Sequence, residues 1–251
     1  MAPLFMGVIW YGSPYFDICV LICAMVAATE LLTISYGNWK RIWALTVLVL
    51  LSASYSALIF NQLLFAIGFA LLASAVNWVI SRAENGNRIW GGGGILYLAL
   101  AVFAILEIRD WETGGRNWSI WLFSVVWATD IGAYFAGKIF GGAKLAPKIS
   151  PGKTWTGTAG GLAAAAVTSA VFSEILFLKQ DALILISIGI AVGIASQLGD
   201  LLESYFKRTN NVKDTGTLIP GHGGLLDRVD SVLLAAPITW LLVPAVLESA
   251  N

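Results

Sequence analysis

The sequence predicts an all-α polytopic membrane protein with about eight transmembrane helices. Hydrophobic residues make up 58% of the 251 residues and charged residues only 12%, whereas soluble domains average about 25% charged residues. The mean hydropathy is +0.78. A third observation, a series of apolar runs separated by polar or Gly/Pro breaks, gives the number of helices. The composition therefore indicates a chain that lies largely in lipid.

Each apolar run approaches the length that a membrane-spanning helix needs, about 20 residues for a hydrocarbon core of about 30 Å. We interpret residues 1–251 as one integral membrane domain, with N-terminal helices in 1–117 and the polar, functional segments in 118–251. The run from Gly94 is short and is compatible with a re-entrant or tilted segment, and Met6–Tyr15 is compatible with an interfacial helix. The predicted spans are Asp17–Ser35, Arg41–Phe60, Leu63–Ile80, Gly94–Ile108, Trp118–Gly137, Thr158–Leu178, Ala182–Glu203 and Val229–Leu247.

The basic residues are unevenly distributed between the two sides of these spans. With the N-terminus outside, only Arg109, Arg116 and Lys179 fall on that side. The positive-inside rule makes the other side cytoplasmic, so the polar loops 138–157 and 204–228 share the cytoplasmic face. The 15 acidic residues balance the 15 basic ones, which gives no argument for nucleic-acid binding. The cytoplasmic basic residues are Lys40, Arg41, Arg82, Arg88, Lys138, Lys144, Lys148, Lys153, Lys207, Arg208, Lys213 and Arg228.

Acidic residues concentrate around the second of these loops, beside the only histidine, His222. Asp200 ends one predicted span and Asp227 begins the next, so the loop between them can bring the two carboxylates together. Magnesium prefers one or two carboxylates together with water and substrate phosphates. Asp230 lies three residues after Asp227 and shares its helical face. The ordinary alternative is a solvated loop between charged helix ends.

Two further segments suit anionic ligands. The glycine-dense turn Pro220–Gly224 leads into a helix whose first amide groups are unpaired, and such a turn can approach phosphate closely. In the other cytoplasmic loop, Lys144, Lys148, Ser150, Lys153 and Thr154 form a positive, hydroxyl-bearing segment. The alternative for this loop is an ordinary positive-inside segment.

Two acids lie within predicted spans and require partners, because an unpaired charge is costly in lipid. Asp130 is one of them. A loop cation, a bound cation or a polar neighbour such as Gln197 are all open as its partner. Glu30 is equally compatible with a role in helix packing and with a functional role.

Taken together, these segments resemble the phosphatidate cytidylyltransferase, or CDP-diacylglycerol synthase, family. The C-terminal signature has about a dozen specified positions at fixed spacing, and the upstream segments from Asp130 to Gly137, Ser150 to Thr154 and Gln197 to Ser204 are similar to that family as well. The resemblance covers the chain from Asp130 onward. The signature residues are Ser204, Lys207, Arg208, Lys213, Asp214, Gly216, Ile219, Pro220, His222, Gly223, Gly224, Asp227, Arg228 and Asp230.

The resemblance implies a magnesium-dependent reaction of CTP with phosphatidic acid at a polar cavity facing the cytoplasm. It implies Asp200, Asp227, Asp230 and Asp214 as metal ligands, and leaves room for a second, monovalent cation and for a homodimer. The implied location is multi-pass in a lipid bilayer, the cytoplasmic membrane for a bacterial protein. The implied catalytic residues are Asp200, Asp227, Lys207, His222 and Asp230, and the implied substrate-binding residues are Lys144, Ser150, Lys153, Thr154, Ser204, Arg208, Lys213, Gly223, Gly224 and Arg228.

Two other functions stay open. One is a CTP-dependent transferase that acts on another lipid phosphate or a polyprenol. The other is an ion-coupled transporter, in which Glu30, Asp130 and Asp200 would relay ions. We see no internal repeat of the kind that many transporters show, and the polar groups gather at one face of the predicted spans.

Overall fold

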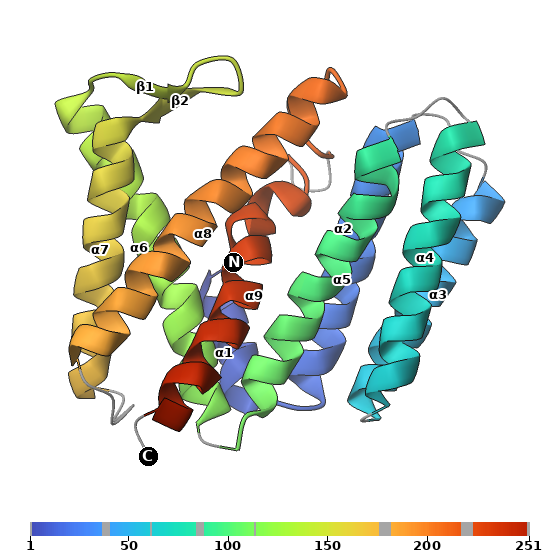
Figure 1. Ribbon diagram of the computed structural model, residues 1–251, viewed down its shortest axis with the longest axis horizontal. Helices are drawn as coiled ribbons and strands as arrows, with labels where there is room; N and C mark the ends of the chain where they lie inside the picture. The colour runs from blue at the N-terminus through green and yellow to red at the C-terminus, as the bar shows by residue number, and fades with distance from the viewer. Residues whose placement is uncertain are drawn as a thin grey trace. The chain divides into compact units, whose positions relative to one another are not determined.

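The computed structural model describes residues 2–36, 41–60, 62–83, 88–112, 114–175, 182–216 and 223–249 (Figure 1). These residues are mostly helical, in agreement with the predicted all-α class. The elements are α1 (Ala2–Tyr11), α2 (Tyr15–Tyr36), α3 (Arg41–Ile59), α4 (Leu63–Ala83), α5 (Arg88–Asp110), α6 (Gly115–Phe140), β1 (Lys144–Ala146), β2 (Ser150–Thr154), α7 (Trp155–Ile175), α8 (Ala182–Thr209) and α9 (Leu226–Ser249).

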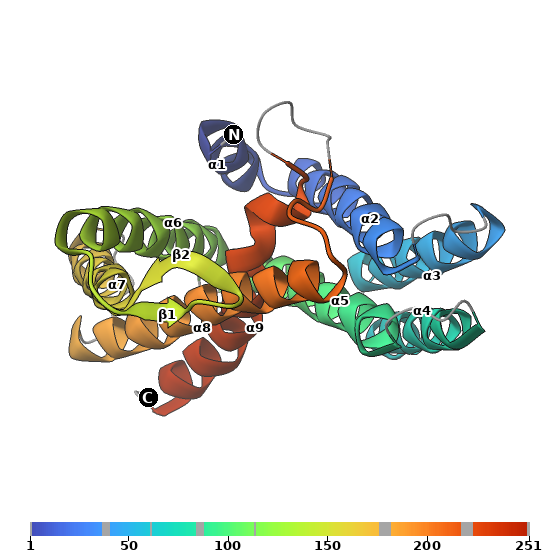
Figure 2. The same ribbon diagram turned by 90° about the horizontal axis from the view of Figure 1, so that it is seen from above.

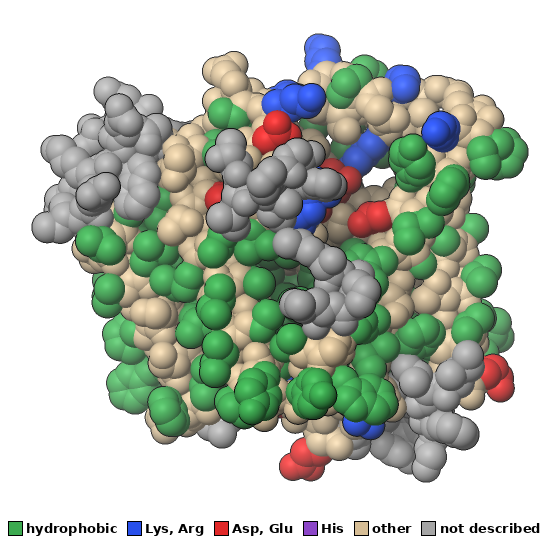
Figure 3. Space-filling view, turned by 180° about the vertical axis from the view of Figure 1, so that it is seen from behind, with side chains coloured by type: hydrophobic (Ala, Val, Ile, Leu, Met, Phe, Trp, Pro, Cys, Tyr) green, Lys and Arg blue, Asp and Glu red, His purple; other side chains and the backbone are tan. Residues whose placement is uncertain are grey.

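Five of the described helices are long and apolar enough to cross a membrane by length and composition, namely α2, α4, α5, α6 and α8. Their sides carry exposed hydrophobic residues, such as Leu64, which is 85% exposed. Figure 3 shows hydrophobic side chains over much of one face. Exposed apolar surface on this scale fits a lipid environment, because soluble proteins rarely expose large contiguous apolar patches. The other three predicted spans fall on α3, α7 and α9, so the number eight stays a prediction.

The chain divides into two compact units. Unit 1 comprises Met1–Trp10, Ala104–Tyr205 and Asp230–Asn251, and unit 2 comprises Tyr11–Phe103 and Phe206–Val229. The prediction of one integral membrane domain, divided at residues 117 and 118, stays a prediction.

In unit 1, helices α6 and α7 pack closely through small residues. A Cβ atom on Gly132 of α6 would lie 2.7 Å from Ala164 Cβ, and one on Gly160 of α7 would collide with Ala136. Small residues let helix backbones approach closely in lipid, where van der Waals packing contributes much of the association between helices. This contact fixes the two helices that support the cavity described below.

A β-hairpin connects α6 to α7, where the sequence predicted only a polar loop. Strand β1 pairs antiparallel with β2, with Lys144 opposite Thr154 and Ala146 opposite Ser150. Figure 2 shows the hairpin beside one end of α6 and α7. Thr154 closes the hairpin and caps α7, because its Oγ1 accepts a hydrogen bond from the Gly157 N–H at 3.1 Å.

In unit 2, α5 contradicts the expectation of a short fourth span. It starts at Arg88, because the glycine run at 91–94 is part of the helix. These glycines give space to side chains of neighbouring helices. A Cβ on Gly92 would lie 3.0 Å from a ring atom of Trp78 on α4, and one on Gly94 would lie 2.9 Å from Leu31 on α2. Asn77 of α4 also donates a hydrogen bond to the Gly91 carbonyl at 2.5 Å.

The second polar loop is shorter than predicted. Helix α8 continues to Thr209, so Ser204, Lys207 and Arg208 lie on a helix, and α9 begins at Leu226, just before Asp227. Extending the helix fixes the spacing of its polar residues. Met6–Tyr15, proposed as an interfacial helix, corresponds in part to α1, which begins earlier at Ala2 and ends at Tyr11.

The contact between α6 and α7 predicts a stability effect at Gly160. We expect Gly160→Ala to lower the free energy of unfolding by about 1–3 kcal/mol, because the added methyl group overpacks the contact with Ala136. The matched control is Gly68→Ala on α4, where a Cβ meets nothing within 4 Å and alanine is expected to stabilise the helix by about 0.5–1 kcal/mol. Thermal unfolding in detergent, followed by circular dichroism, compares the two. Equal stabilisation by both substitutions would contradict the packing argument.

Candidate active site

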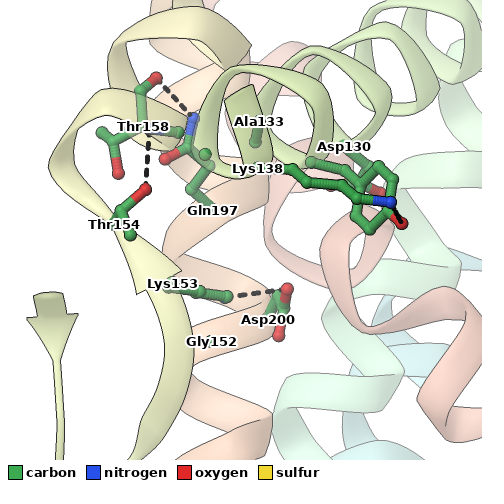
Figure 4. A pocket seen from close by; sticks show the side chains of 12 residues that line it. Asp130, Ala133, Lys138, Gly152, Lys153, Thr154, Thr158, Gln197 and Asp200 are labelled. Atoms are coloured by element: carbon green, nitrogen blue, oxygen red, sulfur yellow. Dashed lines mark hydrogen bonds and ion pairs between the residues drawn. The ribbon is translucent and has the colours of Figure 1, made fainter. Parts of the chain in front are cut away.

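Unit 1 contains a cavity of about 420 Å³ between α6, β2, α7 and α8. Its wall mixes backbone at glycines with hydroxyl, carboxylate and ammonium groups, so it can hold a polar ligand. Figure 4 shows Lys153 reaching from β2 toward Asp200 on α8. The lining residues are Asp130, Ala133, Tyr134, Gly137, Lys138, Gly152, Lys153, Thr154, Gly157, Thr158, Gln197 and Asp200.

An ion pair connects two walls of this cavity. Lys153 Nζ lies 2.7 Å from Asp200 Oδ2, and the two side chains are 24% and 33% exposed. The Nζ atom is buried and takes part in no hydrogen bond of good geometry. The contact is therefore mainly a charge pairing between the ammonium and the carboxylate. Ser204, one turn after Asp200 on α8, lies 3.4 Å from Asp200 Oδ1, at the long limit for a hydrogen bond.

The second carboxylate in the cavity wall belongs to Asp130 on α6. Its Oδ1 lies 3.4 Å from the Ser231 hydroxyl of α9, and the same hydroxyl lies 3.3 Å from Asp230 Oδ1. Ser231 therefore links Asp130 to Asp230. Gln197, which the sequence offered as a partner for Asp130, donates instead to the Thr158 carbonyl at 3.1 Å.

A glycine beside Asp200 brings α9 close to α8. A Cβ on Gly199 would lie 2.7 Å from the Asp230 carbonyl oxygen. Only a residue without a side chain allows this approach. The glycine that precedes the aspartate in the motif therefore places the Asp230 backbone next to the turn that carries Asp200.

A second polar cluster lies in unit 2, around Asp227 in the first turn of α9. Lys207 Nζ lies 2.6 Å from Asp227 Oδ1, and these side chains are only 14% and 7% exposed. The other oxygen, Oδ2, accepts hydrogen bonds from the Thr215 N–H at 2.9 Å, the Thr215 hydroxyl at 2.9 Å and the Gly224 N–H at 2.8 Å. Oδ2 is thus held in place, while Oδ1 faces the ammonium group of Lys207.

These contacts set the ionisation of Asp227. Burial alone raises the pKa of a carboxyl group, but the hydrogen bond from Lys207 and the N–H groups of Thr215 and Gly224 lower the pKa of Asp227 by more. Asp227 is therefore a carboxylate at neutral pH. Gly223, which precedes Gly224, has a φ of +82°, a conformation that glycine adopts without strain.

Glu30 of α2 joins this cluster, and its role was left open by the sequence. It is 8% exposed. Its Oε1 accepts a hydrogen bond from the Leu225 N–H at 2.8 Å, and its Oε2 accepts from the Leu226 N–H at 2.8 Å and the Thr215 hydroxyl at 3.1 Å. Sequence reasoning also assigned no role to Thr215, although it lies inside the motif. Its position between two residues of the C-terminal signature, Asp214 and Gly216, was the signal available.

Most of the remaining predicted residues are exposed. Ser150 begins β2 and is half-buried, whereas Lys144, Arg208, Lys213, Asp214 and Arg228 are exposed. Arg208 donates to the Val212 carbonyl at 3.4 Å. His222 lies outside the described residues, so its predicted role is untested.

The described residues contain no group of three or more His, Cys, Asp or Glu side chains arranged to hold a metal ion. A magnesium site needs fewer protein ligands, since water and phosphate oxygens supply the rest. Asp227 fits such a site. Its Oδ1 already faces one positive charge, the ammonium of Lys207, so the position beside Oδ1 stabilises a cation. Asp200 belongs to unit 1 and Asp227 to unit 2, and their convergence on one cation stays a prediction.

Comparison with known proteins identifies the class. A model of the cytidylyltransferase family matches residues 1–246, and the chain belongs to that family. The match also covers the N-terminal half, beyond the region from Asp130 onward that the motifs had suggested.

Similar proteins include three bacterial enzymes, each named phosphatidate cytidylyltransferase. The Brucella melitensis protein is 36% identical over 234 residues, which cover 92% of this chain and 83% of the relative. The Pseudomonas aeruginosa protein is 39% identical over 208 residues, covering 78% and 74% respectively. The Bacillus subtilis protein is 36% identical over 196 residues, covering 78% and 65%.

The two lysine–carboxylate pairs differ in burial, which predicts different costs of breaking them. We expect Lys207→Met to lower the free energy of unfolding by about 3 kcal/mol, since it leaves a buried carboxylate without its cation. Lys153→Met is expected to cost about 1 kcal/mol, because Asp200 is more exposed. Chemical denaturation in detergent without divalent cations measures both.

A control for this comparison is Lys148→Met in the exposed hairpin turn. It is expected to change the stability by less than about 0.5 kcal/mol. A larger loss for Lys153→Met than for Lys207→Met would show that burial does not decide the energetic weight of these pairs.

Proposed function

We propose that this protein is a phosphatidate cytidylyltransferase, which transfers the cytidylyl group of CTP to phosphatidic acid and releases pyrophosphate. The observation that carries the proposal is the family match over residues 1–246, together with relatives of that name that align with up to 92% of the chain. The product is CDP-diacylglycerol, an intermediate for phospholipid synthesis.

The reaction joins two anionic substrates. An oxygen of the lipid phosphate attacks the α-phosphorus of CTP, the bond from that phosphorus to the bridging oxygen of the β-phosphate breaks, and pyrophosphate leaves. The attacking phosphate is already ionised near neutral pH, so no covalent enzyme intermediate is needed. What the protein must supply is alignment of the two substrates and neutralisation of their charge.

The basic residues provide that neutralisation. Lys153 lies in the wall of the unit 1 cavity, and its ammonium group suits a phosphate group. Lys207, Arg208, Lys213 and Arg228 divide between the triphosphate and the lipid phosphate, with bidentate contacts available only to the arginines. The hairpin also contributes polar groups for substrate binding, from Lys144, Ser150 and Thr154. Phosphate or water is bound by Ser204 and His222. The backbone can approach a phosphate group at Gly223 and Gly224.

Magnesium is the cofactor that this residue set suits. Asp200 and Asp227 would hold it, with Asp230 and Asp214 in support, and the site leaves room for a second, monovalent cation. When bound, the ion supplies charge stabilisation at the reacting phosphate groups. The carboxylates of Asp200 and Asp227 keep their oxygens in hydrogen-bonded or ion-paired positions in the structure.

The site is proposed to face the cytoplasm, where CTP is available, in a protein that crosses the bilayer several times. The supporting observation is the basic character of the hairpin and of the end of α8, since cytoplasmic segments carry an excess of Lys and Arg. A homodimer is compatible with this arrangement.

The central prediction concerns activity. Purified protein in detergent is expected to release pyrophosphate from CTP only when magnesium and phosphatidic acid are both present. Asp227→Asn is expected to lower kcat by about two to three orders of magnitude, because a charge that faces the cation is removed. Glu174→Gln, at an exposed position near the end of α7, serves as the control.

Each alternative function has its own outcome in this assay. Activity with a polyprenol or another lipid phosphate, but not with phosphatidic acid, would change the substrate. Ion uptake into sealed vesicles without nucleotide, with no pyrophosphate release from any lipid, would replace the enzyme by a transporter.

The orientation predicts a labelling pattern in membrane vesicles. In a variant with Cys19 and Cys23 replaced by serine, Lys148→Cys in the hairpin turn should react with a membrane-impermeant maleimide only in inverted vesicles. Glu112→Cys, in the exposed turn between α5 and α6, should react only in right-side-out vesicles. The reverse pattern would place the hairpin outside the cytoplasm.

A further inference from the structure

We propose that Glu30 is a positioning residue for Asp227, acting through Thr215, and that it thereby sets the affinity of the enzyme for its divalent cation. This inference rests on the proposed function, because it gives Asp227 a role toward the cation. No role for Glu30 follows from the family match or from the names of the relatives.

Glu30 lies in an unexpected environment for an acid. It belongs to the apolar stretch Tyr15–Ser35 of α2, where an ionised side chain is costly unless it is paired or hydrogen-bonded. The structure satisfies both carboxylate oxygens with donors that are 185 to 196 positions away in the sequence. The segment before α9 is therefore anchored to α2.

The anchor acts on the start of α9. The N–H groups of Leu225 and Leu226 both donate to Glu30 at 2.8 Å, and the first N–H groups of a helix have no partner within the helix. A negative charge at this end also interacts favourably with the helix dipole. Since Asp227 follows Leu226 directly, fixing these two amides fixes the backbone that carries Asp227.

Thr215 connects the two carboxylates. Its hydroxyl lies 3.1 Å from Glu30 Oε2 and 2.9 Å from Asp227 Oδ2. A hydroxyl has one proton, so it can donate to only one of them at a time. The Thr215 N–H also donates to Asp227 Oδ2, at 2.9 Å. Thr215 therefore transmits the position of Glu30 to the oxygen of Asp227 that does not face the cation.

Two glycines next to Thr215 and Leu225 leave space for the Glu30 carboxylate. A Cβ on Gly216 would lie 2.9 Å from Glu30 Oε1, and one on Gly224 would lie 2.5 Å from Glu30 Oε2 and would collide with the Thr215 hydroxyl. Both motif glycines thus admit the Glu30 carboxylate. The close approach of Glu30 is therefore one physical reason for a glycine at both positions.

A role limited to holding the fold together would affect stability alone. A positioning role also affects cation binding, because the hydrogen bonds to Oδ2 set the direction in which Oδ1 points. Groups that orient a metal ligand typically contribute about 10- to 100-fold to metal affinity or activity. Metal binding therefore distinguishes the two roles.

The test compares Glu30→Gln with a matched control, Asp17→Asn. Both residues are acids of α2, and both are 8% exposed, but Asp17 accepts its hydrogen bond from Ser13 at the start of its own helix. Mn²⁺ is titrated into the purified full-length protein, followed by electron paramagnetic resonance, with a CTP analogue that carries a methylene bridge between its α- and β-phosphates. The magnesium dependence of pyrophosphate release is measured alongside.

We expect Glu30→Gln to weaken Mn²⁺ binding and to raise the magnesium concentration for half-maximal activity, each by about 10-fold or more. An amide places N–H groups against the donors of Leu225, Leu226 or Thr215, so at least one hydrogen bond is lost. Asp17→Asn should bind Mn²⁺ as the natural protein does. A folded Glu30→Gln protein that binds Mn²⁺ like the natural protein overturns the proposal, whatever its thermal stability.

A second pair of variants decides the matter if Glu30→Gln does not fold. Thr215→Val removes the hydroxyl at nearly constant volume, and Thr215→Ser keeps it. The proposal expects Thr215→Val to bind Mn²⁺ about 10-fold more weakly than Thr215→Ser, and equal binding by the two overturns it. If the natural protein binds Mn²⁺ but releases no pyrophosphate with phosphatidic acid, the proposed function fails, and the Mn²⁺ titration still decides the role of Glu30.

Discussion

The hydrogen bonds to the Oδ2 atom of Asp227 are the constraint on which the unit 2 cluster depends. The N–H groups of Thr215 and Gly224 donate to this oxygen, and the Thr215 hydroxyl lies within hydrogen-bond distance of it. Burial of a carboxylate is unfavourable unless such partners compensate it, so Thr215, Gly224 and the start of α9 must take up compatible positions. Glu30 accepts a hydrogen bond from the start of α9, and Lys207 forms an ion pair with the Asp227 carboxylate.

Unit 1 is organised mainly by the packing of small residues between helices. There α6 and α7 approach closely through Gly132 and Gly160, and polar and charged groups line the cavity at one side of them. The hairpin carries Lys153 to Asp200, and its last residue, Thr154, starts α7 as a cap. Packing by small residues thus determines where the charged groups can meet, and the ion pair then neutralises them.

The predictability of these features follows from the range of the interactions. Apolar runs report burial in lipid locally, so most helices were predictable, and the motif spacing identified Asp200, Lys207 and Asp227. The hairpin was missed because Ser150-Pro-Gly-Lys-Thr reads as a turn, with little β-propensity. The short fourth span was wrong because glycine in lipid permits a continuous helix where in water it weakens one. Glu30 was undecidable because its partners lie 185 or more residues away.

The two lysine–carboxylate pairs suggest why this chemistry suits an apolar chain. A buried ammonium needs a negative partner, which is Asp200 for Lys153 and Asp227 for Lys207. A substrate phosphate is also an anion whose oxygens accept charge-assisted hydrogen bonds, so it can take the place of the aspartate beside the lysine. A divalent cation can in turn take the place of the lysine beside the aspartate. Each group would therefore keep an oppositely charged partner before and after the exchange.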